Sequence, residues 1–192
     1  MVLPFYLESI EPFTFRVCSK LNKVLIQGAL KSIGEGAFFQ CSSLESIYIP
    51  ESVSIIQDYT FCRCSSLESI NIPELISFIQ DHTFYKCSSL RKISLSSLTK
   101  VIGKSAFKKC TSLRQISGLS SLIKIDSYAF ENCIYLTGLF TLSSIKIIGK
   151  CVFKHCLSIN KVTFSNLLNF IGKGAFSDCS SLTQMTIPSS VT

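Results

Sequence analysis

The chain has 192 residues, of which 47% are hydrophobic and 16% charged, and its formal net charge is +7. This composition supplies ample material for a core, and the absence of an apolar run of about 18 residues predicts no membrane-spanning helix. Residues 1–7 lack the basic and apolar regions of a secretion signal, so we expect no signal peptide in this sequence.

One cysteine recurs every 23 residues along the whole chain. A phenylalanine lies three positions before each of these cysteines, and an isoleucine lies eight positions before each. The cysteines are Cys18, Cys41, Cys64, Cys87, Cys110, Cys133, Cys156 and Cys179. A fixed period between about 20 and 50 residues indicates a solenoid of stacked repeats.

Residues 33–55 illustrate the first element of each repeat. Ala37, Phe38 and Cys41 are spaced three and four residues apart, which predicts one apolar face of a short helix. A single unit of this size cannot bury its apolar faces alone, whereas stacked units can.

The second element is a strand over residues 44–49. Ile47 and Ile49 point to one side by alternation, and Pro50 ends the strand because it cannot donate to a ladder. We expect an α/β solenoid of about eight 23-residue strand–turn–short-helix repeats, with a parallel sheet on the concave face. The unbroken period predicts one domain over residues 1–192, and we expect a fragment that begins and ends inside a repeat because neither end shows a polar cap.

The segment Leu44-x-x-Ile47-x-Ile49 matches the L-x-x-L-x-L strand of leucine-rich repeats. The fuller repeat resembles that of the BspA-like leucine-rich repeat family of bacterial and protozoan surface proteins; its pattern is I-G-x-x-A-F-x-x-C-x-S-L-x-x-I-x-I-P. Two repeats depart from it, with Gly118 and Thr141 in place of the second strand isoleucine. The resemblance covers nearly the whole chain and implies a leucine-rich-repeat solenoid with a role in adhesion or in binding host proteins at a cell surface.

The ten cysteines raise the question of metal, disulfide or packing roles. Only Cys62 and Cys64 lie close together, and no second pair accompanies them, which argues against a zinc site. Equivalent positions on the helical side are expected too far apart for disulfides. We expect the periodic cysteines to be buried free thiols that pack as small apolar groups, and Cys62 and Cys151, outside the period, to be candidates for exposed thiols.

The sequence offers few groups for catalysis, and His82 and His155 are its only histidines. We expect His82 to be solvated in a turn, while His155 precedes Cys156, which belongs to the core and faces elsewhere. Residues 103–105 resemble the end of a phosphate-binding loop, but Leu98 stands where the first glycine of that motif is required. The Gly-Lys pair is also part of the repeat consensus, since it recurs at residues 149–150 and 172–173. We therefore expect no enzyme, and no catalytic residue, metal, cofactor or small-molecule substrate.

The outward positions of the predicted sheet are polar, small and variable, as expected for a surface that contacts proteins. Tyr48 and Phe140 are aromatic at these positions and can anchor a partner. The candidate partner-binding residues on the concave face are Tyr48, Phe140, Leu25, Arg91, Arg114 and Lys92. We expect a non-enzymatic protein-interaction or adhesion domain whose partner is a host or extracellular-matrix protein. The alternative is a solvated sheet with scattered apolar residues.

Charge is distributed unevenly along the chain. Residues 1–96 carry 8 Lys/Arg and 9 Asp/Glu, whereas residues 97–192 carry 11 and 3. Lysines in or near the predicted helices would form a basic stripe on the convex side: Lys104, Lys108, Lys109, Lys150, Lys154 and Lys173. Binding of anionic surfaces by this stripe is an alternative function, and a merely soluble surface is another. Arginine is scarce and no aromatics interleave, so nucleic acid is not an expected partner.

Two features point to different compartments. The family resemblance implies a cell-surface or extracellular location, whereas many free thiols favour a reducing compartment. An intracellular scaffold of the same fold is therefore a second hypothesis. Membrane contact is expected only through an anchor outside this chain.

Overall fold

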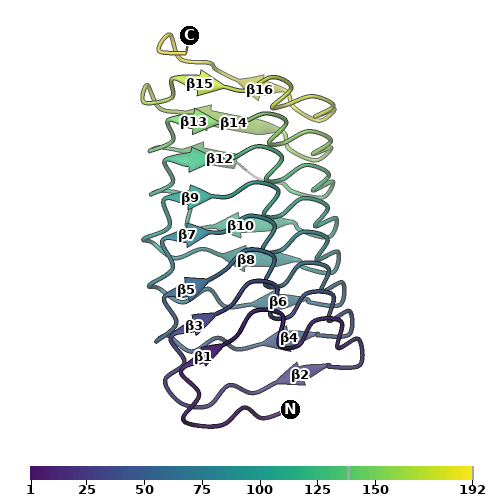
Figure 1. Cartoon of the computed structure of the whole chain (residues 1–192). Helices are drawn as coiled ribbons and strands as arrows, with labels where there is room; N and C mark the ends of the chain where they lie inside the picture. The colour runs from purple at the N-terminus through teal and green to yellow at the C-terminus, as the bar shows by residue number, and fades with distance from the viewer. Residues whose placement is uncertain (138, 192) are drawn as a thin grey trace.

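The structure, a computed structural model, describes residues 1–137 and 139–191, without the side chains of Leu139 and Phe140. Successive turns of the chain stack into a solenoid, with the two termini at opposite ends (Figure 1). The odd-numbered strands are β1 (Ser9–Ile10), β3 (Ser32–Ile33), β5 (Ile55–Ile56), β7 (Phe78–Ile79), β9 (Val101–Ile102), β11 (Lys124–Ile125), β13 (Ile147–Ile148) and β15 (Phe170–Ile171). The even-numbered strands are β2 (Lys23–Val24), β4 (Ser46–Ile47), β6 (Ser69–Ile70), β8 (Lys92–Ser94), β10 (Gln115–Ser117), β12 (Leu139–Leu142), β14 (Lys161–Phe164) and β16 (Gln184–Met185).

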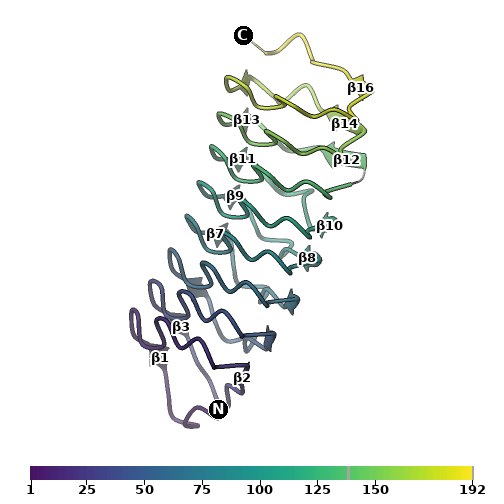
Figure 2. The same ribbon diagram turned by 90° about the vertical axis from the view of Figure 1, so that its right-hand side faces the viewer.

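Most strands pair in parallel with their equivalents in the next turn, and within the described residues the ladders are interrupted between β5 and β7, between β6 and β8, and between β10 and β12. Ser46 lies opposite Ser69 in the even set, and Ser32 lies opposite Ile55 in the odd set, so each pairing joins residues one repeat apart. The predicted parallel pairing of successive repeats is thereby confirmed, although the strand predicted over residues 44–49 is limited to Ser46–Ile47. The odd-numbered strands are absent from the sequence prediction, which places one strand in each repeat. Figure 2 shows the two sets along different sides of the stack.

The predicted short helix is wrong, because the described residues contain no helix and residues 35–40 form consecutive turns. The backbone hydrogen bonds explain why. The Phe39 N–H donates to the Gly36 carbonyl at 2.9 Å within the turn, whereas the Phe38 N–H donates to the Thr60 carbonyl of the next repeat, also at 2.9 Å. Because alternate donors bond to the neighbouring repeat, they are not free to form the i to i−4 bonds of an α-helix.

Left-handed backbone conformations accompany this pattern at two positions of each repeat. Tyr59 and Arg63 have φ values of 57° and 62°, and Gly36 and Gln40 are their equivalents in the preceding repeat. Such a conformation costs an L-residue roughly 1–2 kcal/mol, and it interrupts any helix. The bonds between repeats stabilise it here.

Eight phenylalanines form the interior of the stack. Ring centroids of successive members are 5.2–5.7 Å apart, and their planes lie within 21° of parallel. The six central rings are fully buried, whereas Phe15 and Phe176, which have one stacked neighbour each, are partly buried. The predicted phenylalanine column is thus confirmed as the core.

The periodic cysteines do more than fill space. The Cys64 thiol donates to the carbonyl of Phe38 at 3.1 Å, and the same contact recurs from Cys41 to Cys179 at 3.0–3.1 Å. Each thiol therefore bonds across to the preceding repeat, and we call this row of contacts the thiol ladder. Burial raises the pKa of the Cys41 thiol to about 11, so the proton needed for donation is retained at neutral pH.

All ten cysteines are free thiols, as predicted, but the expected exposure is partly wrong. Cys62 is only 2% exposed, and burial raises its pKa to about 11. Cys151 is partly exposed. Two periodic cysteines predicted to be buried are not, because Cys18 is exposed and Cys179 is partly exposed in the first and last repeats of the series.

Alkylation should distinguish these environments. We expect iodoacetamide at neutral pH to modify Cys18 at least tenfold faster than Cys41, because a pKa raised to about 11 leaves little thiolate and the buried sulfur is inaccessible. Peptide mass spectrometry over a time course measures both rates, and denatured protein provides the control in which the two should react alike. Equal rates in the folded protein would contradict the buried thiol ladder.

The departures at Gly118 and Thr141 are accommodated by a shift of one residue. Leu142 is buried and lies opposite Phe164, so it occupies the position predicted for residue 141. Leu119, next to Gly118, packs against the core in the same way. Gly118 itself has a φ of 78° and its Cα lies against the carbonyl of Leu95, where no side chain fits.

Candidate functional site

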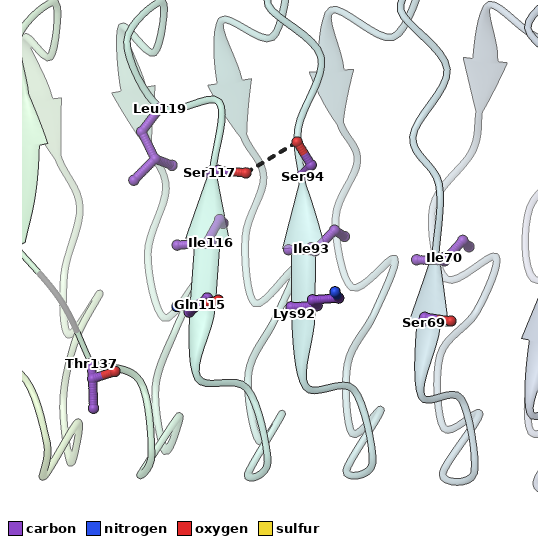
Figure 3. A pocket seen from close by; sticks show the side chains of 10 residues that line it. All are labelled: Ser69, Ile70, Lys92, Ile93, Ser94, Gln115, Ile116, Ser117, Leu119 and Thr137. Carbon is purple, nitrogen blue, oxygen red and sulfur yellow. Dashed lines mark hydrogen bonds between the residues drawn. The ribbon is translucent and has the colours of Figure 1, made fainter.

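The even-numbered strands carry two adjoining hollows on their outward face. One, of about 630 Å³, lies over β6, β8 and β10 (Figure 3). The other, of about 710 Å³, lies over β2, β4 and β6. Both include Ser69 and Ile70, so they form one continuous surface, which we call the even-strand trough.

Strand alternation produces the lining of the trough. Lys92 and Gln115 lie opposite one another and are exposed, whereas Ile93 between Lys92 and Ser94 is buried. The Ser117 hydroxyl donates to that of Ser94 at 3.0 Å, which gives the hollow a polar edge (Figure 3). Leu119 and Thr137 complete its other side.

Tyr48 and Leu25, predicted as partner-binding residues, lie together in the second hollow. Their side chains are 58% and 49% exposed, and Met1 and Val2 line the same hollow. Large apolar groups that are exposed to solvent can be buried by a partner, and aromatic anchors contribute much of the binding energy at protein interfaces. Lys92, also predicted, lines the first hollow.

Asn71 has a role that sequence reasoning missed. Its side-chain amide donates to the Ile49 carbonyl at 2.7 Å and accepts from the Ile49 N–H at 2.8 Å. The side chain therefore replaces a strand partner for Ile49, and Asn71 lines the second hollow. The only sign of these two hydrogen bonds in the sequence is that Asn71 stands at an outward strand position.

The two predicted arginines flank the trough just before their strands. Arg91 is exposed and its guanidinium lies 4.0 Å from the Glu68 carboxylate. The Arg114 guanidinium lies 5.1 Å from the ring centre of Tyr135, a half-exposed aromatic residue that the sequence prediction omits. Both cations remain accessible to a partner.

Phe140, the other predicted aromatic anchor, has a side chain outside the described part of the structure. Its backbone belongs to β12 and lies opposite Val162 in the pairing with β14.

The lysines predicted to form one stripe occupy different environments. Lys108 forms an ion pair with Glu131 at 2.6 Å. Both Lys108 and the exposed Lys150 lie over the Tyr128 ring. Lys109 lies instead in a separate hollow with Arg63. Lys104 and Lys173 are exposed, and Lys154 is partly buried.

His82 is partly buried rather than solvated, which corrects the sequence expectation. Its ring stacks on Tyr59 at 4.6 Å, its Nδ1 is buried without a hydrogen-bond partner, and burial lowers its pKa. His155 lies 3.4 Å from the Asp178 carboxylate. Within the described residues, no cluster of three His, Cys, Asp or Glu side chains is placed to hold a metal ion.

Parallel strands that stack every 23 residues around an apolar interior, with the L-x-x-L-x-L segment in the even set, define a leucine-rich-repeat solenoid. A sequence model of the BspA type leucine rich repeat region matches residues 1–113 and 77–192, in six copies. The chain belongs to this BspA-type family, as its repeat pattern indicates.

Solved structures share the fold at low sequence identity. A T. pallidum leucine-rich repeat protein is 24% identical with a TM-score of 0.64, over 95% of this chain and 77% of that one. A leucine-rich cell surface protein from Faecalibacterium prausnitzii is 23% identical with a TM-score of 0.58, over 99% and 67%. The pneumococcal vaccine antigen PcpA is 22% identical with a TM-score of 0.55, over 99% of this chain and 60% of that one. A comparison with curated protein sequences gave no match.

Among the described residues, no helix has the length and apolar character needed to cross a membrane.

Proposed function

We propose that the even-strand trough binds a protein partner, in the manner of an adhesion or interaction domain. The supporting observation is the continuity of the trough across β2 to β10, with exposed Tyr48 and Leu25 in its second hollow. An elongated, shallow surface with a few aromatic and arginine groups suits a protein better than a small molecule, which needs an enclosing pocket.

Two structural neighbours suggest where such a partner is met. One is described as a cell surface protein and another as a vaccine antigen, which supports a surface role and a host or matrix protein as partner. Labelling of intact cells with a membrane-impermeant biotin reagent tests the location. Absence of labelling, with a known surface protein labelled in parallel, would favour the intracellular scaffold.

We expect Tyr48→Ala to weaken binding to a partner selected from a panel of purified extracellular-matrix proteins by at least tenfold, because truncation removes an exposed aromatic anchor. Biolayer interferometry measures the loss. Tyr6→Ala is the matched control, since Tyr6 is 90% exposed and lines neither hollow. Both variants should keep the unfolding free energy within about 0.5 kcal/mol of the parent. Equal affinities of the two variants would overturn the assignment of Tyr48.

A further inference from the structure

A separate hollow of about 300 Å³ lies in the turn segments of successive repeats. It is lined by three cations, Arg63, Lys86 and Lys109, together with Gln40 and three serines, and no carboxylate lines it. None of the three cations forms an ion pair with a described residue. The hollow therefore concentrates positive charge that the chain does not compensate; we call it the basic hollow.

The three cations stand in one row because they occupy the same position of consecutive repeats. Their φ values are 62°, 60° and 63°, so each side chain leaves the turn in the same direction. The N–H of each donates to a carbonyl of the next repeat at 2.7–2.9 Å, which holds the row rigidly. Parallel turns of a solenoid recur about every 4.8 Å, and the charges should follow that spacing.

Hydroxyl groups accompany the charges. The Ser65 hydroxyl donates to the Ser42 carbonyl, and the Ser88 hydroxyl donates to the Ser65 carbonyl, both at 3.3 Å. These bonds are long for an O–H donor, so the protons can turn toward an oxyanion at little cost. The lining thus offers both charge and neutral donors.

Neighbouring charges leave the row positive. Lys108, beside Lys109 in sequence, is paired with Glu131 at 2.6 Å. Glu68, which follows Ser65 by three residues, lies 4.0 Å from Arg91 outside the lining of the hollow. Lys86 extends over the Tyr85 ring, 5.5 Å from its centre, without a carboxylate partner.

We propose that the basic hollow binds an acidic, sulfated polysaccharide laid along the stack. A row of cations suits a linear polyanion, and the serine hydroxyls and the Gln40 amide suit a hydroxylated one. The lining contains no aromatic platform on which nucleic-acid bases would stack. This site is distinct from the even-strand trough and does not depend on its proposed function.

The test compares two triple variants that remove the same charge. The first is Arg63→Asn with Lys86→Asn and Lys109→Asn, which the backbone tolerates because Asn132 holds the equivalent position with a φ of 62°. The control is Lys104→Ser with Lys150→Ser and Lys173→Ser, since Ser127 occupies that position of its repeat. The probe is a heparin oligosaccharide of defined length, measured by isothermal titration calorimetry at low and physiological salt.

We expect the parent to bind heparin, with affinity falling as salt rises, the first triple variant to lose at least tenfold in affinity, and the control to stay within twofold. Thermal unfolding should be unchanged in both. An equal loss in both variants, or none in the first, would overturn the site. Tighter binding of single-stranded poly-dT or of phosphatidylserine vesicles than of heparin would overturn its assignment to a polysaccharide.

Discussion

Phe107→Ala is expected to lower the free energy of unfolding by about 3–5 kcal/mol. The Phe107 ring is fully buried and stacks on Phe84 and on Phe130, at 5.2 Å in each case. Truncation removes both stacking contacts and leaves a cavity that rigid neighbouring turns cannot fill. Urea unfolding of the variant and the parent gives the difference directly.

Two further variants test how much of this loss comes from ring stacking and how much depends on the position of the ring in the column. Phe107→Leu refills part of the buried volume and should cost less than Phe107→Ala, and the remaining loss then reports the two missing ring contacts. Phe15→Ala should cost less than Phe107→Ala, because Phe15 is partly buried and stacks on one ring. A loss below about 0.5 kcal/mol for Phe107→Ala would contradict the phenylalanine core.

Gly103→Ala is expected to destabilise the fold by about 1–3 kcal/mol through overpacking. A Cβ at Gly103 would lie 2.8 Å from the Ile79 carbonyl oxygen and 2.9 Å from the Asp81 nitrogen, both backbone atoms of the preceding repeat. The backbones must then separate, which weakens the bond at 2.7 Å from the Gly103 N–H to that same carbonyl.

The chain supplies a matched control at the equivalent position of the preceding repeat. Gln80 already carries a Cβ there, so Gln80→Ala adds no atom near the backbone and should change stability by less than about 0.5 kcal/mol. Thermal unfolding of the two variants provides the comparison. If Gly103→Ala were as stable as the parent, the repeats would not approach as closely as the structure shows.

The core could be predicted from sequence because its side chains recur with the repeat. Phe38, Cys41 and Ile47 each mark an inward position, and all three are buried. The helix prediction failed because spacings of three and four residues arise equally from consecutive turns, in which a residue and its third neighbour share a side. The bonds that decide between the two, such as Phe38 to Thr60, join residues one repeat apart and leave no local signal.

Part of the even-strand trough could also be predicted, because outward positions recur with the repeat. Alternation along the strand indicated that Tyr48 and Leu25 face outward, and they do. It could not indicate that Asn71 bonds to the neighbouring backbone, since that depends on distances between repeats. The basic hollow was missed although the sequence contains a signal for it. That signal is the spacing of Arg63, Lys86 and Lys109, which are one period apart.

Hydroxyl-radical footprinting of the chain, alone and with its selected protein partner, tests most directly whether the even-strand trough is the interaction surface. The exposed side chains of Tyr48 and Leu25 should become protected on binding, while Phe78 and Phe170, which are exposed on the odd-numbered strands, should remain reactive. Protection of Phe78 and Phe170 with unchanged reactivity of Tyr48 and Leu25 would contradict the proposal and place the partner on the other side of the solenoid.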